Sequence, residues 1–257
     1  MELTLCIDIG NQTTAFGLFE ADPVRPSVSH GVNRIINPKK VFNKELLTLK
    51  SHLPKEKVSA IFIASVIPNK NEVFSRILQG FYNVTPKFIN AAILKGAYPS
   101  LGADRVANLF GGKEVLGTPV CVIDLGTATT IDVLGANDKY IGGVIIPGIN
   151  LESEVLHKKT AQLPLVPIVE TQGIASLLGK STEECINSGV LWGEYYRIGD
   201  FITEIKKLVP SCEFIFTGGL GKNIAELLNF PYDEWLTLKG IYLLANDTLY
   251  NKFLFFF

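Results

Sequence analysis

Residues 122–130 read Val-Ile-Asp-Leu-Gly-Thr-Ala-Thr-Thr, and residues 6–14 read Cys-Ile-Asp-Ile-Gly-Asn-Gln-Thr-Thr, so one plan occurs twice. In both stretches an apolar strand ends in an aspartate, Asp8 or Asp124, and a glycine and several hydroxyl side chains follow. A second apolar run comes next, which is typical of a β-hairpin. Such a turn offers backbone N–H groups, hydroxyls and one carboxylate to an anion and its metal. The sequence therefore predicts two copies of one phosphate-binding turn.

The alternative interpretation is that each Asp-x-Gly is only a turn between strands, as a single one usually is. A carboxylate at the end of a buried strand loses its hydration, which costs free energy unless it meets a cation or hydrogen-bond donors. Two aspartates in matched surroundings therefore favour binding of a phosphate and its metal ion. Gly10 and Gly126 fit this role, because a residue without a Cβ lets the backbone approach a ligand closely.

Hydrophobic periodicity predicts alternating strands and helices around both turns. In the first half we expect strands at 3–9, 16–19, 27–35, 60–66 and 84–89 and helices at 41–49, 71–78 and 103–115. In the second half we expect strands at 120–124, 130–134, 140–146 and 213–217 and helices at 150–157, 182–208, 223–228 and 240–250. The expected class is α/β, with mixed sheets covered by helices. Two similar three-strand beginnings predict duplicated ribonuclease-H-like domains, 1–117 and 118–257, with a nucleotide cleft between them.

The composition is that of an ordinary globular protein, with 47% hydrophobic residues, 19% charged residues and a net charge of −1. This charge balance does not favour a nucleic-acid partner. Apolar runs stay short of the roughly 20 residues that a membrane span needs, and acidic Glu2 and Asp8 interrupt the N-terminus where a signal peptide would be apolar. We therefore expect a cytoplasmic protein with no membrane partner. The four cysteines are widely spaced, without a Cys-x-x-Cys motif, and are expected to be reduced core residues.

Gly102-Ala103-Asp104-Arg105 follows a loop rich in glycine and proline and begins a predicted helix. In the simpler interpretation, Asp104 is a helix-start carboxylate favoured by the helix dipole and Arg105 is its solvated neighbour. In the functional interpretation, the carboxylate accepts a proton from a substrate hydroxyl while the guanidinium holds an anionic substrate. The position just before the second turn favours the functional interpretation.

Three further segments carry weaker signals. Gly179-Lys180-Ser181 is not a P-loop, because the required preceding glycine is replaced by Ile174. Lys180 to Glu184 is a good helix start, so its hydroxyls either cap the helix or face a substrate. Thr217-Gly218-Gly219 follows a predicted strand, and its small residues would let a flat ring such as adenine lie against the backbone.

Taken in order, these motifs resemble those of the type III pantothenate kinase family, over almost the whole chain. The elements that carry the resemblance are Asp8-Ile9-Gly10-Asn11, Gly102-Ala103-Asp104-Arg105, Asp124-Leu125-Gly126-Thr127-Ala128-Thr129-Thr130, Gly142-Gly143-Val144-Ile145-Ile146-Pro147-Gly148, the helix from Thr182 and Thr217-Gly218-Gly219. The resemblance implies the actin-like ATPase fold of the acetate and sugar kinase superfamily. It also implies transfer of the γ-phosphate of ATP to pantothenate, the first step of coenzyme A synthesis, by a homodimer.

The resemblance also implies roles for individual residues. ATP phosphates and Mg²⁺ would be held by Asp8, Ile9, Gly10, Asn11, Gln12, Thr13, Thr14 and Ala15, and ATP would also contact Thr127. Asp104 would accept the proton, beside a pantothenate site formed by Gly102, Ala103, Arg105, Thr182 and Tyr98. Asp124 would bind the K⁺ or NH₄⁺ ion that the family requires.

Two positions differ from the family pattern. Gln12 stands where Thr or Ser is common, and Gly96 stands where a tyrosine is usual, with Tyr98 displaced from that place. The main alternative to a kinase is a non-catalytic or regulatory accessory factor of the same fold that binds nucleotide. Another kinase or phosphatase of the superfamily is a further alternative. Asp104, Arg105 and Asp124 favour the pantothenate kinase, because a binding protein needs no general base.

Overall fold

The computed structural model describes residues 2–20, 35–43, 49–168 and 176–246, and contacts group the chain into two compact units. Unit 1 is formed by Met1–Gly117 together with Trp235–Phe257, and unit 2 by Thr118–Glu234. The expected domains 1–117 and 118–257 separate at the same residue, but the contacts group the segment from Trp235 with unit 1. The domain division itself stays a prediction. Within the described residues, no helix combines the length and the apolar character that crossing a membrane requires.

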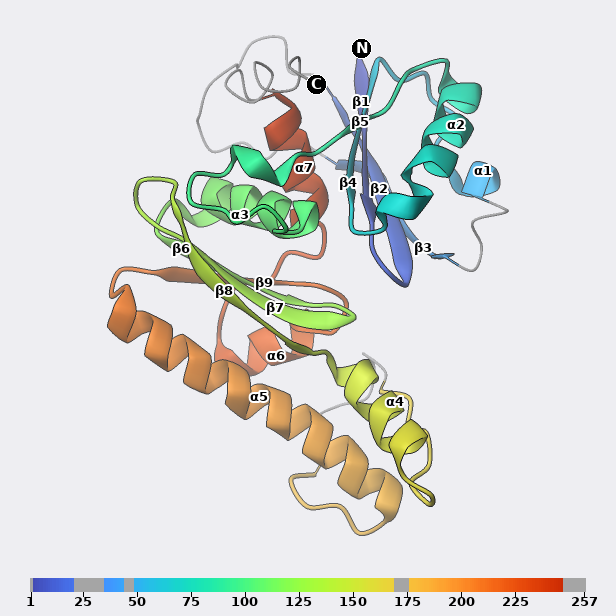
Figure 1. Cartoon of the computed structure of the whole chain (residues 1–257). Coiled ribbons are helices and arrows are strands. Elements are labelled where there is room, and N and C mark those ends of the chain that lie inside the picture. The colour runs from blue at the N-terminus through green and yellow to red at the C-terminus, as the bar shows by residue number, and fades with distance from the viewer. Residues whose placement is uncertain (1, 21–34, 44–48, 169–175, 247–257) are drawn as a thin grey trace. The chain divides into compact units, whose positions relative to one another are not determined.

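Unit 1 is built on a five-stranded mixed sheet in the order β3-β2-β1-β4-β5 (Figure 1). Strands β1, β2 and β3 pair antiparallel, and β4 and β5 add parallel to β1. The strands are β1 (Leu3–Ile9), β2 (Thr13–Glu20), β3 (Ile35–Phe42), β4 (Ala60–Ser65) and β5 (Lys87–Phe88). The helices are α1 (Leu49–His52), η2 (Pro68–Lys70), α2 (Asn71–Tyr82), η3 (Ala91–Ile93), α3 (Ala103–Leu116) and α7 (Leu236–Asn246).

The sheet of unit 1 has helices on both faces. Alternate residues of β1, namely Leu5, Ile7 and Ile9, join one buried cluster with Phe74 and Leu78 of α2. Since successive side chains of a strand point to opposite faces, Cys6 and Asp8 point to the other face. That face is covered by α7, which contacts β1, β2 and β4, and by α3, which packs against α7 and β4. Asp8 therefore lies on the side of the sheet that carries α3.

Unit 2 repeats the first four strands of this arrangement in a sheet of order β8-β7-β6-β9. Its strands are β6 (Val120–Leu125), β7 (Ala128–Leu134), β8 (Tyr140–Pro147) and β9 (Glu213–Thr217). Its helices are α4 (Ile149–Lys159), α5 (Thr182–Leu208) and α6 (Gly221–Leu228). Here too the first three strands pair antiparallel, and the fourth, β9, adds parallel to the first.

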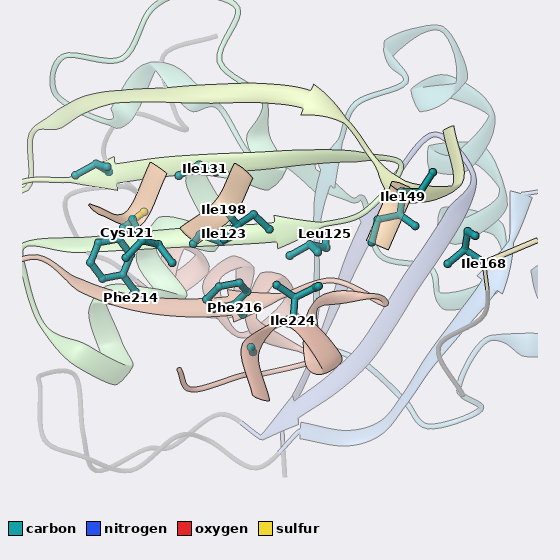
Figure 2. Close-up of a cluster of buried hydrophobic side chains, with 14 of the residues drawn as sticks. Cys121, Ile123, Leu125, Ile131, Ile149, Ile168, Ile198, Phe214, Phe216 and Ile224 are labelled. Atoms are coloured by element: carbon teal, nitrogen blue, oxygen red, sulfur yellow. The ribbon is translucent and has the colours of Figure 1, made fainter. Parts of the chain in front are cut away.

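The core of unit 2 lies between one face of its sheet and the helices α5 and α6 (Figure 2). From the sheet come Cys121, Ile123 and Leu125 of β6, together with Phe214 and Phe216 of β9. The long helix α5 adds Ile186, Val190, Ile198 and Ile202 at helical spacing. Because these β6 side chains point toward α5, Asp124 points to the opposite face of the sheet.

The α/β class and the duplicated ribonuclease-H-like fold are confirmed. Both units begin with a β-hairpin whose first strand has an aspartate as its penultimate residue, a third antiparallel strand follows, and a parallel strand pairs with the first. Helix α5 and strand β9 have the predicted bounds. Their ends carry clear signals in the sequence, since Ser181 caps α5, Pro210 follows it, and Gly218 follows the apolar run of β9.

Three local predictions were wrong or lie outside the described residues. The helix expected at 41–49 fails at its start, because Val41 and Phe42 belong to β3; residues 44–48 lie outside the described residues, and α1 spans Leu49–His52. The third strand runs over Ile35–Phe42, whereas the strand expected at 27–35 falls almost wholly outside the described residues. The strand expected at 84–89 is reduced to Lys87–Phe88.

The cysteine prediction holds for three of the four. Cys6, Cys121 and Cys212 are buried free thiols, and burial raises the pKa of each of them, in the case of Cys212 to about 11. They are therefore protonated and poorly nucleophilic at neutral pH. Cys185 is instead an exposed residue on α5, so it is not part of the core.

Candidate functional site

The first predicted phosphate turn connects β1 to β2. Its ends are closed by the N–H of Gly10, which donates to the carbonyl of Thr13 at 2.9 Å. Asn11 and Gln12 are exposed at the tip, and Asp8 is half-buried at the end of β1. By contrast, the side chains of Ile9 and Ala15 are buried, so these two residues have mainly backbone atoms to offer a ligand.

Asn43, at the end of β3, holds this turn and was missed by the sequence analysis. Its side-chain Nδ2 donates to the carbonyls of Gly10 at 2.7 Å and Asn11 at 3.0 Å. Its backbone N–H donates to the carbonyl of Gln12 at 2.8 Å. Its Oδ1 accepts a hydrogen bond from the Thr14 hydroxyl at 2.8 Å. The sequence carries no local signal for these contacts, because Asn43 is about 30 residues from its partners.

Thr14 consequently differs from its neighbour Thr13. The side chain of Thr14 is fully buried and its hydroxyl is engaged with Asn43, whereas Thr13 is half-exposed. Of the two threonines that follow Gln12, Thr13 is thus the one with a side chain nearer to solvent. Contact of either hydroxyl with a nucleotide stays a prediction.

The second turn, between β6 and β7, is shorter than the first. Asp124 pairs with Thr130 across the hairpin. In the sequence repeat Thr130 corresponds to Thr14, but Asp8 pairs with the next residue, Ala15. The N–H of Gly126 donates to the carbonyl of Ala128 at 3.2 Å, so this turn is closed over one residue fewer. The two aspartates are equivalent in the fold, but the turns that follow them are not.

Asp124 lies against the loop that follows β9. It pairs in register with Thr217, and Gly218 comes next with φ of +85°. A Cβ on Gly218 would lie 2.5 Å from Oδ1 of Asp124 and 2.6 Å from the carbonyl oxygen of Leu125. Only glycine fits this position, and a carboxylate oxygen and a carbonyl oxygen border it. This is an all-oxygen environment of the kind that hard cations prefer.

Thr127 lies beside the start of α4. Its carbonyl accepts a hydrogen bond from the N–H of Gly148 at 3.2 Å, and a Cβ on Gly148 would lie 2.6 Å from the same oxygen. The glycine-rich segment that ends at Gly148 thus packs on the second turn. Within unit 2, Asp124, Thr127 and the Thr217-Gly218 loop lie around one hairpin.

The third predicted element, Gly102 to Arg105, forms the first turn of α3, as expected. The backbone N–H of Arg105 donates to Oδ1 of Asp104 at 2.8 Å, and a Cβ on Gly102 would collide with that oxygen. Glycine at 102 therefore allows the carboxylate to fold back over the helix start. Asp104 remains half-buried, whereas Arg105 is 6% exposed.

Tyr98 belongs to the same group of residues. Nη1 of Arg105 donates to the hydroxyl of Tyr98 at 2.7 Å, and the Tyr98 side chain is 41% exposed. Although Tyr98 is displaced from the usual family position, its hydroxyl reaches Arg105. A partly exposed phenol linked to a buried guanidinium can hold an anionic or hydroxyl-bearing ligand.

Thr182 is the first residue of α5 and its side chain is exposed. The cap is supplied by Ser181, whose hydroxyl accepts a hydrogen bond from the N–H of Glu184 at 3.2 Å. Oε2 of Glu184 accepts from the N–H of Lys180 at 2.7 Å, which completes a capping arrangement. Capping is thus the role of Ser181 and not of Thr182.

A partly buried ionic network, centred on the buried Glu194, ties α5 to the second turn, and it too was missed. The hydroxyl of Thr129 donates to Oε1 of Glu194, which is fully buried. Arg197 donates to Glu194 at 2.6 Å and to Glu152 of α4 at 2.5 Å. Burial raises the pKa of Glu194, and the Thr129 hydroxyl and Arg197 charge oppose that rise. The signal was visible, since Glu194 continues the series Ile186, Val190, Ile198 on the apolar face of α5.

The structure thus gathers the predicted residues in two sets, one in each unit. Unit 1 holds the first turn, Tyr98 and the Gly102–Arg105 element, and unit 2 holds Asp124, Thr127 and Thr182. Among the described residues, no group of three or more His, Cys, Asp or Glu side chains is arranged around a metal ion. A metal bound here would take further ligands from backbone carbonyls, water or phosphate oxygens.

Comparison with known proteins identifies the family. A family model described as type III pantothenate kinase matches residues 4–204. The type III pantothenate kinase of Sulfurihydrogenibium sp. (strain YO3AOP1) is 35% identical over 256 residues, which cover 94% of this chain and 99% of that protein.

Solved structures agree on the fold. A Campylobacter jejuni protein described as a candidate Baf family transcriptional activator has a TM-score of 0.60 and 22% identity, over 95% of this chain and 98% of that one. A candidate N-acetylmannosamine kinase from Listeria monocytogenes has a TM-score of 0.51 and 12% identity, over 94% and 98%. At these identities the likeness is one of fold. The family match and the 35% identical relative go further, and the chain belongs to the type III pantothenate kinase family.

Proposed function

We propose that the protein transfers the γ-phosphate of ATP to the primary hydroxyl of pantothenate, giving 4′-phosphopantothenate and ADP. The observation that carries this proposal is membership of the type III pantothenate kinase family over nearly the full length. The hydroxyl oxygen forms the new bond to phosphorus, the bond between the γ-phosphorus and the bridging oxygen breaks, and that electron pair leaves with ADP. This reaction is the first step of coenzyme A synthesis.

Asp104 is proposed as the acceptor of the hydroxyl proton. Its carboxylate stands at the start of α3, half-buried and close to Arg105. Arg105 and Tyr98 form a hydrogen-bonded pair that suits the carboxylate and hydroxyls of pantothenate, with Gly102 and Ala103 beside them. Thr182 is proposed to supply a further hydroxyl contact, because capping of α5 is carried out by Ser181.

ATP is proposed to bind through the segment Asp8 to Ala15 and through Thr127. Phosphoryl transfer depends mainly on positioning and on neutralising charge, which backbone N–H groups and a metal ion supply. Mg²⁺ bound near Asp8 would neutralise the phosphates. Asp124, with the Leu125 carbonyl bordering the same glycine, suits a monovalent cation such as K⁺ or NH₄⁺. We also propose a homodimer and a cytoplasmic location, where ATP is available.

A coupled assay of ADP formation tests the proposal directly. The full chain is given MgATP with and without pantothenate, in K⁺ buffer and in Na⁺ buffer of equal ionic strength, and the product is identified by mass spectrometry. We expect ADP formation to require pantothenate and to be much faster in K⁺. If the folded protein binds ATP but forms no phosphopantothenate in either buffer, the regulatory alternative replaces the kinase.

A further inference from the structure

Asn43 makes four hydrogen bonds to the first turn from a separate strand, and none of the roles proposed above uses it. Strand β3 pairs with β2 so that Phe42 lies opposite Thr13, which brings Asn43 level with the tip of the turn. Its side chain and its backbone together reach Gly10, Asn11, Gln12 and Thr14. A single residue thus fixes nearly the whole length of the turn.

The carbonyl groups explain why this arrangement suits an anion. Three successive carbonyls, those of Gly10, Asn11 and Gln12, accept hydrogen bonds from Asn43. In a trans peptide the C=O and the following N–H point in opposite directions. The N–H groups of Asn11, Gln12 and Thr13 therefore point away from Asn43. Carbonyl oxygens would repel a phosphate, whereas a row of N–H groups attracts one.

The second turn provides an internal comparison. Each turn is closed by a backbone hydrogen bond, Gly10 to Thr13 in the first and Gly126 to Ala128 in the second, but the second turn is one residue shorter. The first turn is longer, so it has more backbone freedom that must be restricted before a ligand binds. Preorganised donors bind an anion more tightly because less conformational entropy is lost on binding. Asn43 supplies this restriction at the turn where ATP phosphates are proposed to bind.

We propose that Asn43 is a positioning residue for the phosphate donor: it holds the carbonyls of Gly10 to Gln12 on one side, so that the N–H groups of Asn11 to Thr13 face the phosphates of ATP. This inference rests on the proposed function, since it takes the first turn as the ATP site. It is specific to the donor and predicts no direct effect on pantothenate.

Asn43→Asp is the variant that tests the proposal. The introduced carboxylate can still accept from Thr14 but cannot donate to Gly10 and Asn11, and it faces their carbonyl oxygens. We expect the dissociation constant of a non-hydrolysable MgATP analogue, measured by calorimetry at pH 8, to rise at least tenfold. The Michaelis constant for pantothenate should stay within twofold.

Asn37→Asp is the matched control. It makes the same chemical change on the same strand, where Asn37 is exposed and donates only a long hydrogen bond of 3.3 Å to Glu56. Its affinity for the analogue should equal that of the parent protein. Unchanged affinity in Asn43→Asp would overturn the proposal, and so would equal losses of ATP and pantothenate binding with a lowered melting temperature, which indicate a general structural role.

A measurement on the unsubstituted protein covers the case in which the variants do not fold. Addition of the analogue should shift the backbone amide resonances of Asn11, Gln12 and Thr13 in an NMR spectrum of labelled protein. Unshifted resonances, or an absence of analogue binding, overturn the proposal. If the analogue binds and shifts these resonances but no phosphopantothenate forms, the inference about Asn43 stands and the proposed kinase activity is wrong.

Discussion

Asp104 combines a structural contact with the proposed catalytic one. One of its oxygens accepts the N–H of Arg105, which an asparagine oxygen can also accept. Asp104→Asn should therefore fold normally while losing the proton acceptor. Because general-base contributions are about 10² to 10⁴ in rate, we expect turnover to fall by that factor, with MgATP affinity unchanged. Steady-state kinetics and calorimetry on the same preparation provide the measurement.

Asp138→Asn is the control for this substitution, because Asp138 is an exposed turn residue with φ of 55°, a conformation that asparagine adopts readily. It should keep full turnover. If the Asp104→Asn variant folds and keeps near-parental turnover, Asp104 is not the proton acceptor and serves only at the start of the helix.

Tyr98 is the partner that connects the buried Arg105 to the surface. Tyr98→Phe removes the hydroxyl that accepts from Arg105 and leaves the ring in place. A hydrogen bond to a charged group contributes about 1.5 to 3 kcal/mol, so the Michaelis constant for pantothenate should rise about ten- to 150-fold. The constant for ATP should not change.

Tyr82→Phe makes the same change elsewhere in unit 1, where the hydroxyl donates to the Pro54 carbonyl at 2.7 Å. This control is expected to lose some stability and no substrate affinity. If both variants show the same Michaelis constant for pantothenate, Tyr98 does not contribute to the substrate site.

Among the elements, α3 and α7 pack most closely. A Cβ on Gly240 of α7 would collide with the backbone of Ala107 in α3, and one on Gly111 would lie 2.7 Å from the Leu236 carbonyl. Overpacking of this kind costs about 1–3 kcal/mol or more, since a backbone must move. Gly240→Ala should therefore lower the free energy of unfolding by at least that amount, measured by denaturant titration.

Gly80→Ala is the contrasting variant, because a Cβ there meets nothing within 4 Å. Gly80 lies in helix α2, where alanine is favoured by up to about 1 kcal/mol, so this protein should be slightly stabilised. Similar effects of both variants would contradict the close packing of α3 on α7.

The buried Glu194 gives α5 and the second turn a pH-dependent stability. Its pKa is raised in the folded protein, chiefly by burial. The protonated carboxyl therefore contributes its full stabilisation at pH values below 4.5, the ordinary pKa of the unfolded chain. This contribution is lost as the pH rises through the raised pKa of the folded protein. Glu194→Gln removes this dependence. The stability of the parent protein relative to the variant should fall as the pH rises above 4.5, by at most about 1.4 kcal/mol per pH unit.

Glu204→Gln controls for the loss of a charge on the same helix, since Glu204 and its partner Lys207 are both exposed. Thermal unfolding of the three proteins across this pH range provides the measurement. Parallel curves for the parent and Glu194→Gln would show that the Glu194 carboxyl does not titrate abnormally.

The elements also show how far the sequence could predict the structure. Helix α5 and strand β9 were predictable because their ends carry clear signals: Ser181 caps α5, Pro210 follows it, and Gly218 follows the continuous apolar run of β9. Strand β3 was not, because it is an edge strand in which only Val41 is buried, so its apolar pattern is weak. Asn43 was invisible for another reason: its role lies in contacts with residues about 30 positions away, and nothing in the neighbouring residues signals them.

At the scale of the whole molecule, we predict a homodimer. The family resemblance supports it, and unit 2 exposes large apolar side chains that include Ile141 and Ile145 of β8 and Tyr196 and Leu208 of α5. Exposed apolar groups of this kind often mark subunit interfaces. Light scattering should give twice the chain mass of 28.2 kDa.

Ile145→Glu is expected to shift that mass toward the monomer, whereas Val73→Glu, on an exposed position of α2, should leave it unchanged. A monomer at all micromolar concentrations, with full activity, would contradict the dimer.

The return of the chain to unit 1 at Trp235 affects how the protein is made. The β-sheet of unit 1 is complete once residue 88 has been synthesised, but helix α7, which covers β1, β2 and β4, comes from the last part of the chain. During translation, the ribosome releases all of unit 2 before this cover exists. The nascent N-terminal region therefore has α3 but not α7 on that face of its sheet, and the part of the face that α7 covers in the finished protein stays exposed until then. Truncation before α7 therefore leaves the part of that face under α7 exposed permanently.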